Sequence, residues 1–200
     1  MIKPFFLGLG IEVGCDEVGR GCLAGPVFAA AVILPKNFSE PLINDSKKLS
    51  AKKREFLRDI IQNNAVEWAI AKVDVQQIDE INILNASILA MHKALNKLKC
   101  KPDLIIVDGN KFKPYKNIPY QCIIKGDSKY MSIAAASILA KTYRDDFMKK
   151  IHNEYPCYDW INNKGYPTKT HCEAILKNGL SPWHRLSFHA KNQLKINFII

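Results

Sequence analysis

Two adjacent carboxylates, Asp16 and Glu17, end an apolar run and are followed at once by the segment Gly19-Arg20-Gly21. Like charges held this close raise each other's pKa unless a cation compensates them, so the pair is costly within an apolar stretch. Sites rich in carboxylate oxygens suit hard divalent cations. The pair therefore predicts a metal site, although an isolated Asp-Glu pair is more commonly a strand end with two solvated acids.

Two further acids lie beside glycines at predicted boundaries. Asp108 follows the apolar run 104–107, and Asp127 follows Gly126. Two Mg²⁺ or Mn²⁺ ions held about 3.5–4 Å apart by such acids can stabilise both the attacking and the leaving oxygen of a phosphodiester. We predict one cluster with nuclease chemistry, made of Asp16, Glu17, Asp108 and Asp127.

The composition is that of a basic globular protein. Its 200 residues are 48% hydrophobic, which is enough for one core, so we expect residues 1–200 to form a single domain and a monomer. The net charge of +10 favours a polyanionic partner. The apolar stretches are too short to span a bilayer, and no signal-peptide pattern is recognised, so a cytoplasmic protein is expected. The six cysteines form no C-x-x-C pair and predict reduced thiols.

The hydrophobic pattern predicts strands alternating with helices. The expected strands span 9–15, 27–34, 66–73, 104–107 and 120–124, and the expected helices span 50–63, 78–99, 132–150 and 169–177. This order indicates an α/β or α+β sheet covered by helices. Ligands of open α/β sheets bind at the carboxyl ends of strands, where Asp16 and Asp108 are expected to lie.

The adjacency of Asp16 and Glu17 poses a geometric problem. Successive side chains of a strand point to opposite faces. We therefore expect the backbone to leave the strand ladder at Glu17, with the glycine-rich segment after Val18 supplying the break.

Five groups of segments, in order, resemble the motif series of ribonuclease HII, the type 2 ribonuclease H family. They are Gly14–Gly21; Asp45–Ser50; Asp108–Asn110; Lys125–Ser128 with Ala134–Lys141 and Arg144-Asp145; and Lys164–Thr168 with His171. The resemblance runs from about residue 9 to 188. It implies a ribonuclease H-like mixed central sheet flanked by helices, with a small helical, substrate-binding region from about residue 155.

The resemblance also implies an activity. Such an endonuclease hydrolyses the RNA strand of RNA/DNA hybrids and incises 5′ to ribonucleotides embedded in duplex DNA, leaving a 3′-hydroxyl and a 5′-phosphate. The four acids match the family's metal ligands, which hold two Mg²⁺ or Mn²⁺ ions during catalysis.

Five residues match the family's substrate contacts. The backbone of Gly19, Arg20 and Gly21 is expected to approach the ribose 2′-hydroxyl, the group that distinguishes RNA from DNA. Lys47 is expected to contact a phosphate, and Tyr166 to stack on the sugar of the following deoxynucleotide. Each has a rival interpretation. Arg20 could make a surface ion pair, Lys47 could be a solvated lysine, and Tyr166 could be a packing aromatic. His171 and Asn110 stay open between capping and functional roles.

Three other functions are alternatives to this one. A ribonuclease HIII-like enzyme would carry a long N-terminal extension and would differ at the Gly-Arg-Gly segment. A metal-free ribonuclease would need a His/Lys acid–base pair, and a non-catalytic nucleic-acid-binding protein would have no use for its acids. The sequence departs from the family at Cys15 and Cys22, and 182–188 resembles the closing segment only loosely, so no substrate contact is assigned there.

Overall fold

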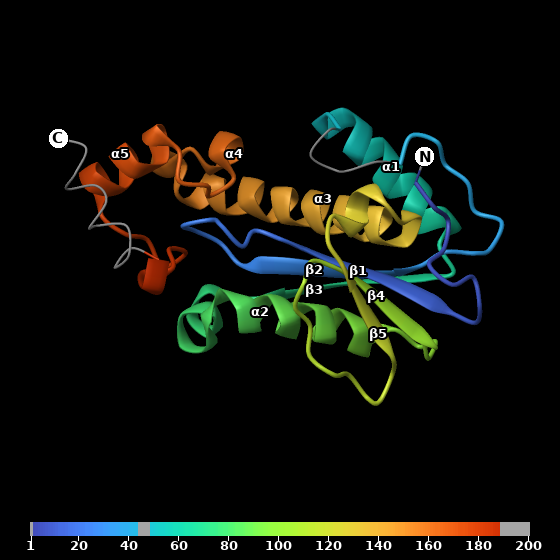
Figure 1. Cartoon of the computed structure of the whole chain (residues 1–200). Helices are drawn as coiled ribbons and strands as arrows, with labels where there is room; N and C mark the ends of the chain where they lie inside the picture. The colour runs from blue at the N-terminus through green and yellow to red at the C-terminus, as the bar shows by residue number, and fades with distance from the viewer. Residues whose placement is uncertain (1, 44–48, 189–200) are drawn as a thin grey trace.

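The computed structural model describes residues 2–43 and 49–188, and within them a mixed five-stranded sheet lies between helices (Figure 1). The strands are β1 (Glu12–Val18), β2 (Val27–Ile33), β3 (Glu67–Val73), β4 (Leu104–Asp108) and β5 (Tyr120–Ile123). The helices are α1 (Ala51–Asn64), α2 (Val75–Lys97), α3 (Met131–Glu154), α4 (Trp160–Asn163) and α5 (Lys169–Asn178), with short 3-10 helices η2 (Gly126–Ser128) and η3 (Pro156–Tyr158).

The sheet order is β3-β2-β1-β4-β5, which confirms the predicted mixed α/β architecture. β1 runs antiparallel to β2 and parallel to β4, so the acid-bearing ends of β1 and β4 meet at one edge of the layer. Every residue of β2 is buried, as its continuous apolar run predicts. β3 lies at the edge of the sheet, in agreement with its alternating pattern.

Alternate residues of β1 face the two helical layers. Val13 and Cys15 belong to the core cluster that α2 completes, whereas Gly14 backs onto α3, where a Cβ atom would collide with the Ser132 backbone. In Figure 1, α1 and α3 cover one face of the sheet and α2 the other. By the same alternation Asp16 faces α3 and Glu17 faces α2.

Two expectations about β1 are wrong. The strand starts at Glu12 instead of residue 9, because Gly8 and Gly10 adopt positive φ angles of 72° and 65° and turn the chain before it. The ladder to β2 also does not break at Glu17, which pairs with Ala29. The break occurs on the other side, where pairing with β4 ends at Cys15 and Val107. Asp16 therefore lies level with Asp108, the last residue of β4, and Glu17 lies one residue beyond it.

Helix α2 contains a kink that the periodicity did not predict. Asn82 has a φ of 64°, and its side-chain Oδ1 accepts hydrogen bonds from the backbone N–H groups of Leu84 and Asn85. Asn82 thus caps the second part of α2, which runs beside the end of β4.

The C-terminal region sits at the far end of α3. This helix continues past the sheet to Glu154 and carries α4 and α5 (Figure 1). All six cysteines are free thiols, as expected. Within the described residues, none of the helices combines the length and apolarity that crossing a bilayer requires.

Candidate active site

Three of the predicted acids influence one another electrostatically at the open ends of β1 and β4. Asp16 is 5% exposed, and its Oδ1 accepts a hydrogen bond from the backbone N–H of Glu17 at 2.7 Å. Glu17 and Asp108 line a small polar hollow that also includes Gly109 and Asn110. Because β4 ends at Asp108, level with Asp16, the Asp108 charge influences acids on both faces of β1.

The fourth acid is linked to the others through the end of β4. Asp108 Oδ1 accepts a hydrogen bond from the backbone N–H of Gly126 at 2.6 Å, and the next residue, Asp127, is buried in η2. A Cβ atom at Gly126 would crowd Ile133, so the small residue permits this close packing. The structure thus brings η2 against the end of β4.

The electrostatics of these acids suit a divalent cation. Burial raises the pKa of Asp16 well above its ordinary value, and the charges of Glu17 and Asp108 raise it further. Burial also raises the pKa of Glu17, although Arg20 opposes that shift. A positive ion placed among these groups would relieve both effects, and an all-carboxylate donor set is typical of sites for Mg²⁺ or Mn²⁺.

Local partners hold the acids apart in this arrangement. Glu17 Oε1 bonds to the Arg20 guanidinium at 3.1 Å, while Asp16 and Asp108 accept backbone N–H groups. Across the described parts of the chain, no group of three or more Asp, Glu, His or Cys side chains has ready metal-binding geometry. The Arg20 contact uses one of the two Glu17 carboxylate oxygens.

Asp16→Asn is expected to raise the thermal stability of the metal-free protein at pH 7.5. The folded-state pKa of Asp16 lies above its unfolded value, so its ionisation destabilises the fold as pH rises through the folded pKa. Asparagine removes this cost, and the gain should shrink towards pH 4, where wild-type Asp16 is protonated too. Melting in EDTA at both pH values measures this, with exposed Asp59→Asn as the control. A lower melting temperature at both pH values would contradict the argument.

The segment after β1 is held by a buried arginine from the opposite end of the chain. Gly19 is buried, whereas Arg20 and Gly21 are exposed. The Arg185 guanidinium, fully buried, donates hydrogen bonds to the carbonyl oxygens of Gly19, Arg20 and Gly25 at 2.7–3.0 Å. Burial lowers the pKa of Arg185 to about 10. This segment is thus fixed by its backbone while its outer surface stays free for a ligand.

A second buried arginine joins this segment to the C-terminal region. Arg144 of α3 donates to the carbonyl oxygens of Pro26, Ala24 and Lys164 at 2.9–3.1 Å. Gly19 has a φ of 95°, and a Cβ atom there would collide with the Arg144 side chain. Arg144 lies in a motif segment, but the sequence alone predicts no role for it.

Tyr166 lies beside the same segment. Its ring is 38% exposed, and both burial and the neighbouring Cys22 thiol raise the pKa of its phenol. The backbone next to it is fixed because Gly165 accepts a hydrogen bond from the Leu23 N–H at 2.7 Å. The predicted contact residues at the two ends of the chain are therefore neighbours.

His171 belongs to a buried network. Its Nδ1 lies 2.9 Å from the Tyr166 carbonyl oxygen, and its Nε2 accepts the Trp160 indole N–H at 3.0 Å and lies 3.2 Å from His184 Nε2. These contacts indicate a structural role for His171, which holds the backbone of Tyr166. Asn110 is exposed beside Asp108, and its role stays a prediction.

Not every predicted contact can be located. Lys47 lies outside the described residues.

The sequence did not reveal the roles of Asp79 and Arg185, because their partners are remote in sequence. Asp79 accepts hydrogen bonds from the N–H groups of Leu186 and Ser187 and so holds the segment that contains Arg185. The only signal was the arginine itself within the weak match at 182–188.

Comparison with known proteins identifies close relatives along nearly the whole chain. The sequence model of the family Ribonuclease HII matches residues 13–191. A ribonuclease HII of Christiangramia forsetii is 64% identical over 186 residues, covering 92% of this chain and 94% of the relative. A ribonuclease HII of Bacteroides fragilis is 59% identical over 189 residues, covering 94% of each.

Solved structures share the fold. The ribonuclease H2 from Pyrococcus horikoshii OT3 superposes with a TM-score of 0.75 at 26% identity, covering 94% of this chain and 98% of that one. A Bst-RNase HIII in complex with Mn²⁺ also has a TM-score of 0.75, at 22% identity, covering 95% of this chain and 71% of that one. The second likeness concerns the fold alone.

Proposed function

The chain belongs to the ribonuclease HII family of metal-dependent endonucleases that hydrolyse RNA in RNA/DNA hybrids, and we propose that its hydrolysis takes place at the open ends of β1 and β4. The proposed ligands of the metal ions are Asp16, Glu17, Asp108 and Asp127. The observation that supports this site best is the raised pKa of Asp16, which burial and the charges of two neighbouring acids produce together.

The metal chemistry would follow from these ligands. Two Mg²⁺ or Mn²⁺ ions, when bound, would activate the attacking water and stabilise the leaving oxygen. The protein's own residues hold the acids in place: Ser137 and the Glu17 backbone hydrogen-bond to Asp16, and Gly126 donates to Asp108. Arg20 already offsets part of the raised Glu17 pKa, so an ion would relieve Asp16, whose pKa is raised by burial and by two like charges, more than Glu17.

The substrate class would be read by Gly19, Arg20 and Gly21. Arg185 binds the carbonyl oxygens of Gly19 and Arg20, and the exposed side of the segment is free to approach a ribose 2′-hydroxyl. Tyr166, at the edge of the same surface, would stack on the next deoxynucleotide sugar. We propose incision 5′ to a ribonucleotide embedded in duplex DNA, with Lys47 contacting a phosphate, by a monomeric, single-domain, cytoplasmic protein.

Incision of a duplex with one ribonucleotide tests this function. The purified protein, supplied with Mg²⁺ or Mn²⁺, is expected to cut once, 5′ to the ribonucleotide, leaving a 3′-hydroxyl that a DNA polymerase extends. An all-DNA duplex of the same sequence is the control. Equal cutting of both duplexes, or a cyclic phosphate end, would exclude the proposed site and mechanism.

Gly21→Ala should reduce incision at a ribonucleotide without destabilising the fold. A Cβ atom at Gly21 meets nothing within 4 Å in the protein, so only an approaching ligand would be obstructed. We expect a loss of at least about tenfold in kcat/KM, equivalent to about 1.4 kcal/mol, with an unchanged melting temperature. Gly19→Ala is the matched comparison: its Cβ atom would collide with Arg144, and the melting temperature should fall. Full activity of Gly21→Ala would argue against close backbone approach.

Tyr166→Ala should impair incision at a single ribonucleotide more than incision within a long hybrid. The proposed contact is to a deoxynucleotide sugar, which exists only at a junction. Tyr166→Phe keeps the ring and should retain most activity, which separates stacking from the phenol hydroxyl. The measurement is kcat/KM on both substrates, and equal losses on the two would count against junction recognition.

A further inference from the structure

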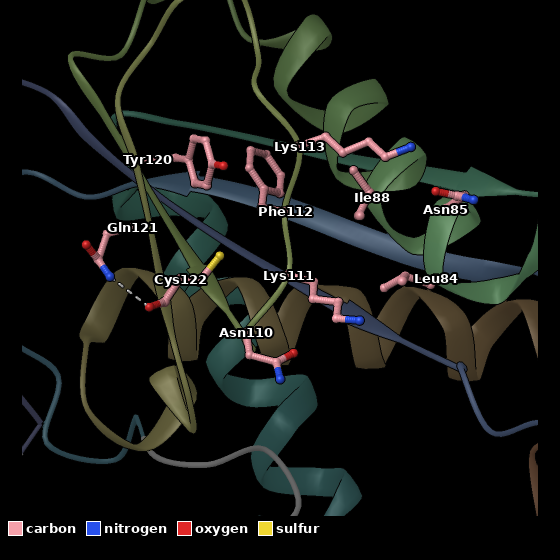
Figure 2. A pocket seen from close by; sticks show the side chains of 10 residues that line it. All are labelled: Leu84, Asn85, Ile88, Asn110, Lys111, Phe112, Lys113, Tyr120, Gln121 and Cys122. Carbon is pink, nitrogen blue, oxygen red and sulfur yellow. Dashed lines mark hydrogen bonds between the residues drawn. The ribbon is translucent and has the colours of Figure 1, made fainter.

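A second hollow opens beside the acids, on the α2 side of the sheet (Figure 2). Its volume of about 460 Å³ is within the range of about 300–1,000 Å³ that is typical of small-molecule sites. It shares Leu84, Ile88, Asn110 and Lys111 with the smaller hollow that contains Glu17 and Asp108. A strand bound at the acids could therefore continue into it.

The charge of this hollow is that of an anion site. Lys111 and Lys113 line it, and in the described part of the chain no carboxylate does. Figure 2 shows both side chains extending from the loop after β4 towards α2. Lys111 follows Asp108 by three residues, so their Cα atoms lie within about 11 Å of each other. A phosphate near Lys111 would thus be close to the reacting one along the same strand.

One wall of the hollow is apolar, which a phosphate backbone does not require. Leu84 and Ile88 of α2 line the hollow together with Phe112 and Tyr120, and Tyr120 is 38% exposed. Tyr120 packs edge-on against Phe112, with ring centroids 5.2 Å apart. Paired bases in a duplex have their faces covered by stacking, whereas an unpaired base offers a face to an aromatic ring. The hollow therefore offers an apolar, aromatic wall for a base and two lysines for its phosphate.

The loop that carries the two lysines is held against α2. His92 lies 3.2 Å through its Nε2 from the Lys113 carbonyl oxygen, and its ring packs on Phe112. The Tyr115 hydroxyl donates to Asn96 at 2.8 Å. These contacts fix the hollow before any ligand arrives, which lowers the entropic cost of binding.

We propose that this hollow binds one unpaired nucleotide of the substrate strand, with its phosphate near Lys111 and Lys113 and its base against Tyr120. The proposal rests on the proposed function, because the strand reaches the hollow only if its neighbouring phosphate lies at the acids. The protein would then favour ribonucleotides that lie next to a bulged or frayed position.

Binding to three duplexes tests the proposal. Each contains one ribonucleotide; the first is fully paired, and the others carry one unpaired nucleotide immediately 5′ or 3′ to it. Fluorescence anisotropy in EDTA at low salt measures affinity without cleavage. One bulged duplex is expected to bind about tenfold more tightly than the paired one, a typical effect of base–aromatic stacking. Tyr120→Ala should abolish this gain, and Tyr120→Phe should retain it.

The lysines have a separate measurement. The double variant Lys111→Ala/Lys113→Ala should lower the slope of log affinity against log salt by about two for the favoured duplex. The control Lys99→Ala/Lys101→Ala removes two exposed lysines outside the lining and should leave the slope unchanged. An unchanged slope in the first variant would overturn the assignment of the phosphate.

The proposal fails if neither bulged duplex binds more tightly, or if the gain persists in Tyr120→Ala. Incision of the fully paired duplex by wild type, assayed with Mg²⁺, reports on the proposed function alone. Its failure can therefore be distinguished from failure of the nucleotide pocket.

Discussion

Asp108→Asn is expected to abolish incision at an embedded ribonucleotide while leaving the fold intact. Asp108 ends β4 and faces the same hollow as Glu17, so a neutral amide there removes a charge that the proposed ions require. A loss of about a thousandfold or more in kcat, equivalent to about 4 kcal/mol, is expected in Mg²⁺. The assay is single-turnover incision of a duplex with one ribonucleotide.

The amide can still accept the Gly126 N–H, so stability should change little. Exposed Asp59→Asn serves as the matched acid control and should cut at the wild-type rate. Affinity for the duplex in EDTA should not fall in Asp108→Asn, because the acid repels the phosphates when no ion is bound. Retained incision by Asp108→Asn would remove β4 from the proposed site.

Arg185→Lys is expected to cost about 3 kcal/mol of unfolding free energy, because an ammonium group cannot reach the separate carbonyl oxygens that the guanidinium holds. The buried carbonyls of Gly19 and Gly25 would lose their donor. Urea denaturation measures the change. Discrimination between duplexes with and without a ribonucleotide should also fall, since the segment that we propose reads the sugar would lose its support.

Arg58→Lys is the control for Arg185→Lys. Arg58 makes a partly exposed ion pair with Asp146 and stacks on the Tyr143 ring at 3.9 Å. Together these contacts contribute about 1–2 kcal/mol, less than the loss expected for Arg185→Lys. Equal effects of the two substitutions would show that the burial of Arg185 has no special importance. Loss of stability with unchanged discrimination would make Arg185 a purely structural residue.

Local patterns predicted most of the fold. The apolar run of β2, the Ser50 cap of α1 and the alternation of β3 each reflect an environment that a few neighbouring residues determine, and each is confirmed. The end of β1 was misplaced for a non-local reason. Glu17 pairs with Ala29 on one side and has lost β4 on the other, and no property of Glu17 itself reports where a different strand ends.

The candidate site divides in the same way. Asp16 and Asp108 could be chosen from the sequence because acids at the ends of apolar runs are unusual. The hydrogen bond from Arg185 to the Gly19 carbonyl could not be predicted, because the two residues are 166 positions apart. A single arginine also has no sequence periodicity from which its burial could be inferred. The kink at Asn82 was equally invisible, since one asparagine within a helical pattern is an ordinary residue.

The tie between Arg185 and Gly25 also sets an order of events during synthesis. The ribosome adds about 5–20 residues per second, so the 160 positions between the two residues take roughly 8 to 32 seconds to make. Throughout this interval the nascent chain already carries Asp16 and Glu17, but the glycine segment beside them lacks the donor that shapes it. The surface that we propose reads the ribose is therefore among the last parts of the growing chain to be completed, long after its first acids have emerged.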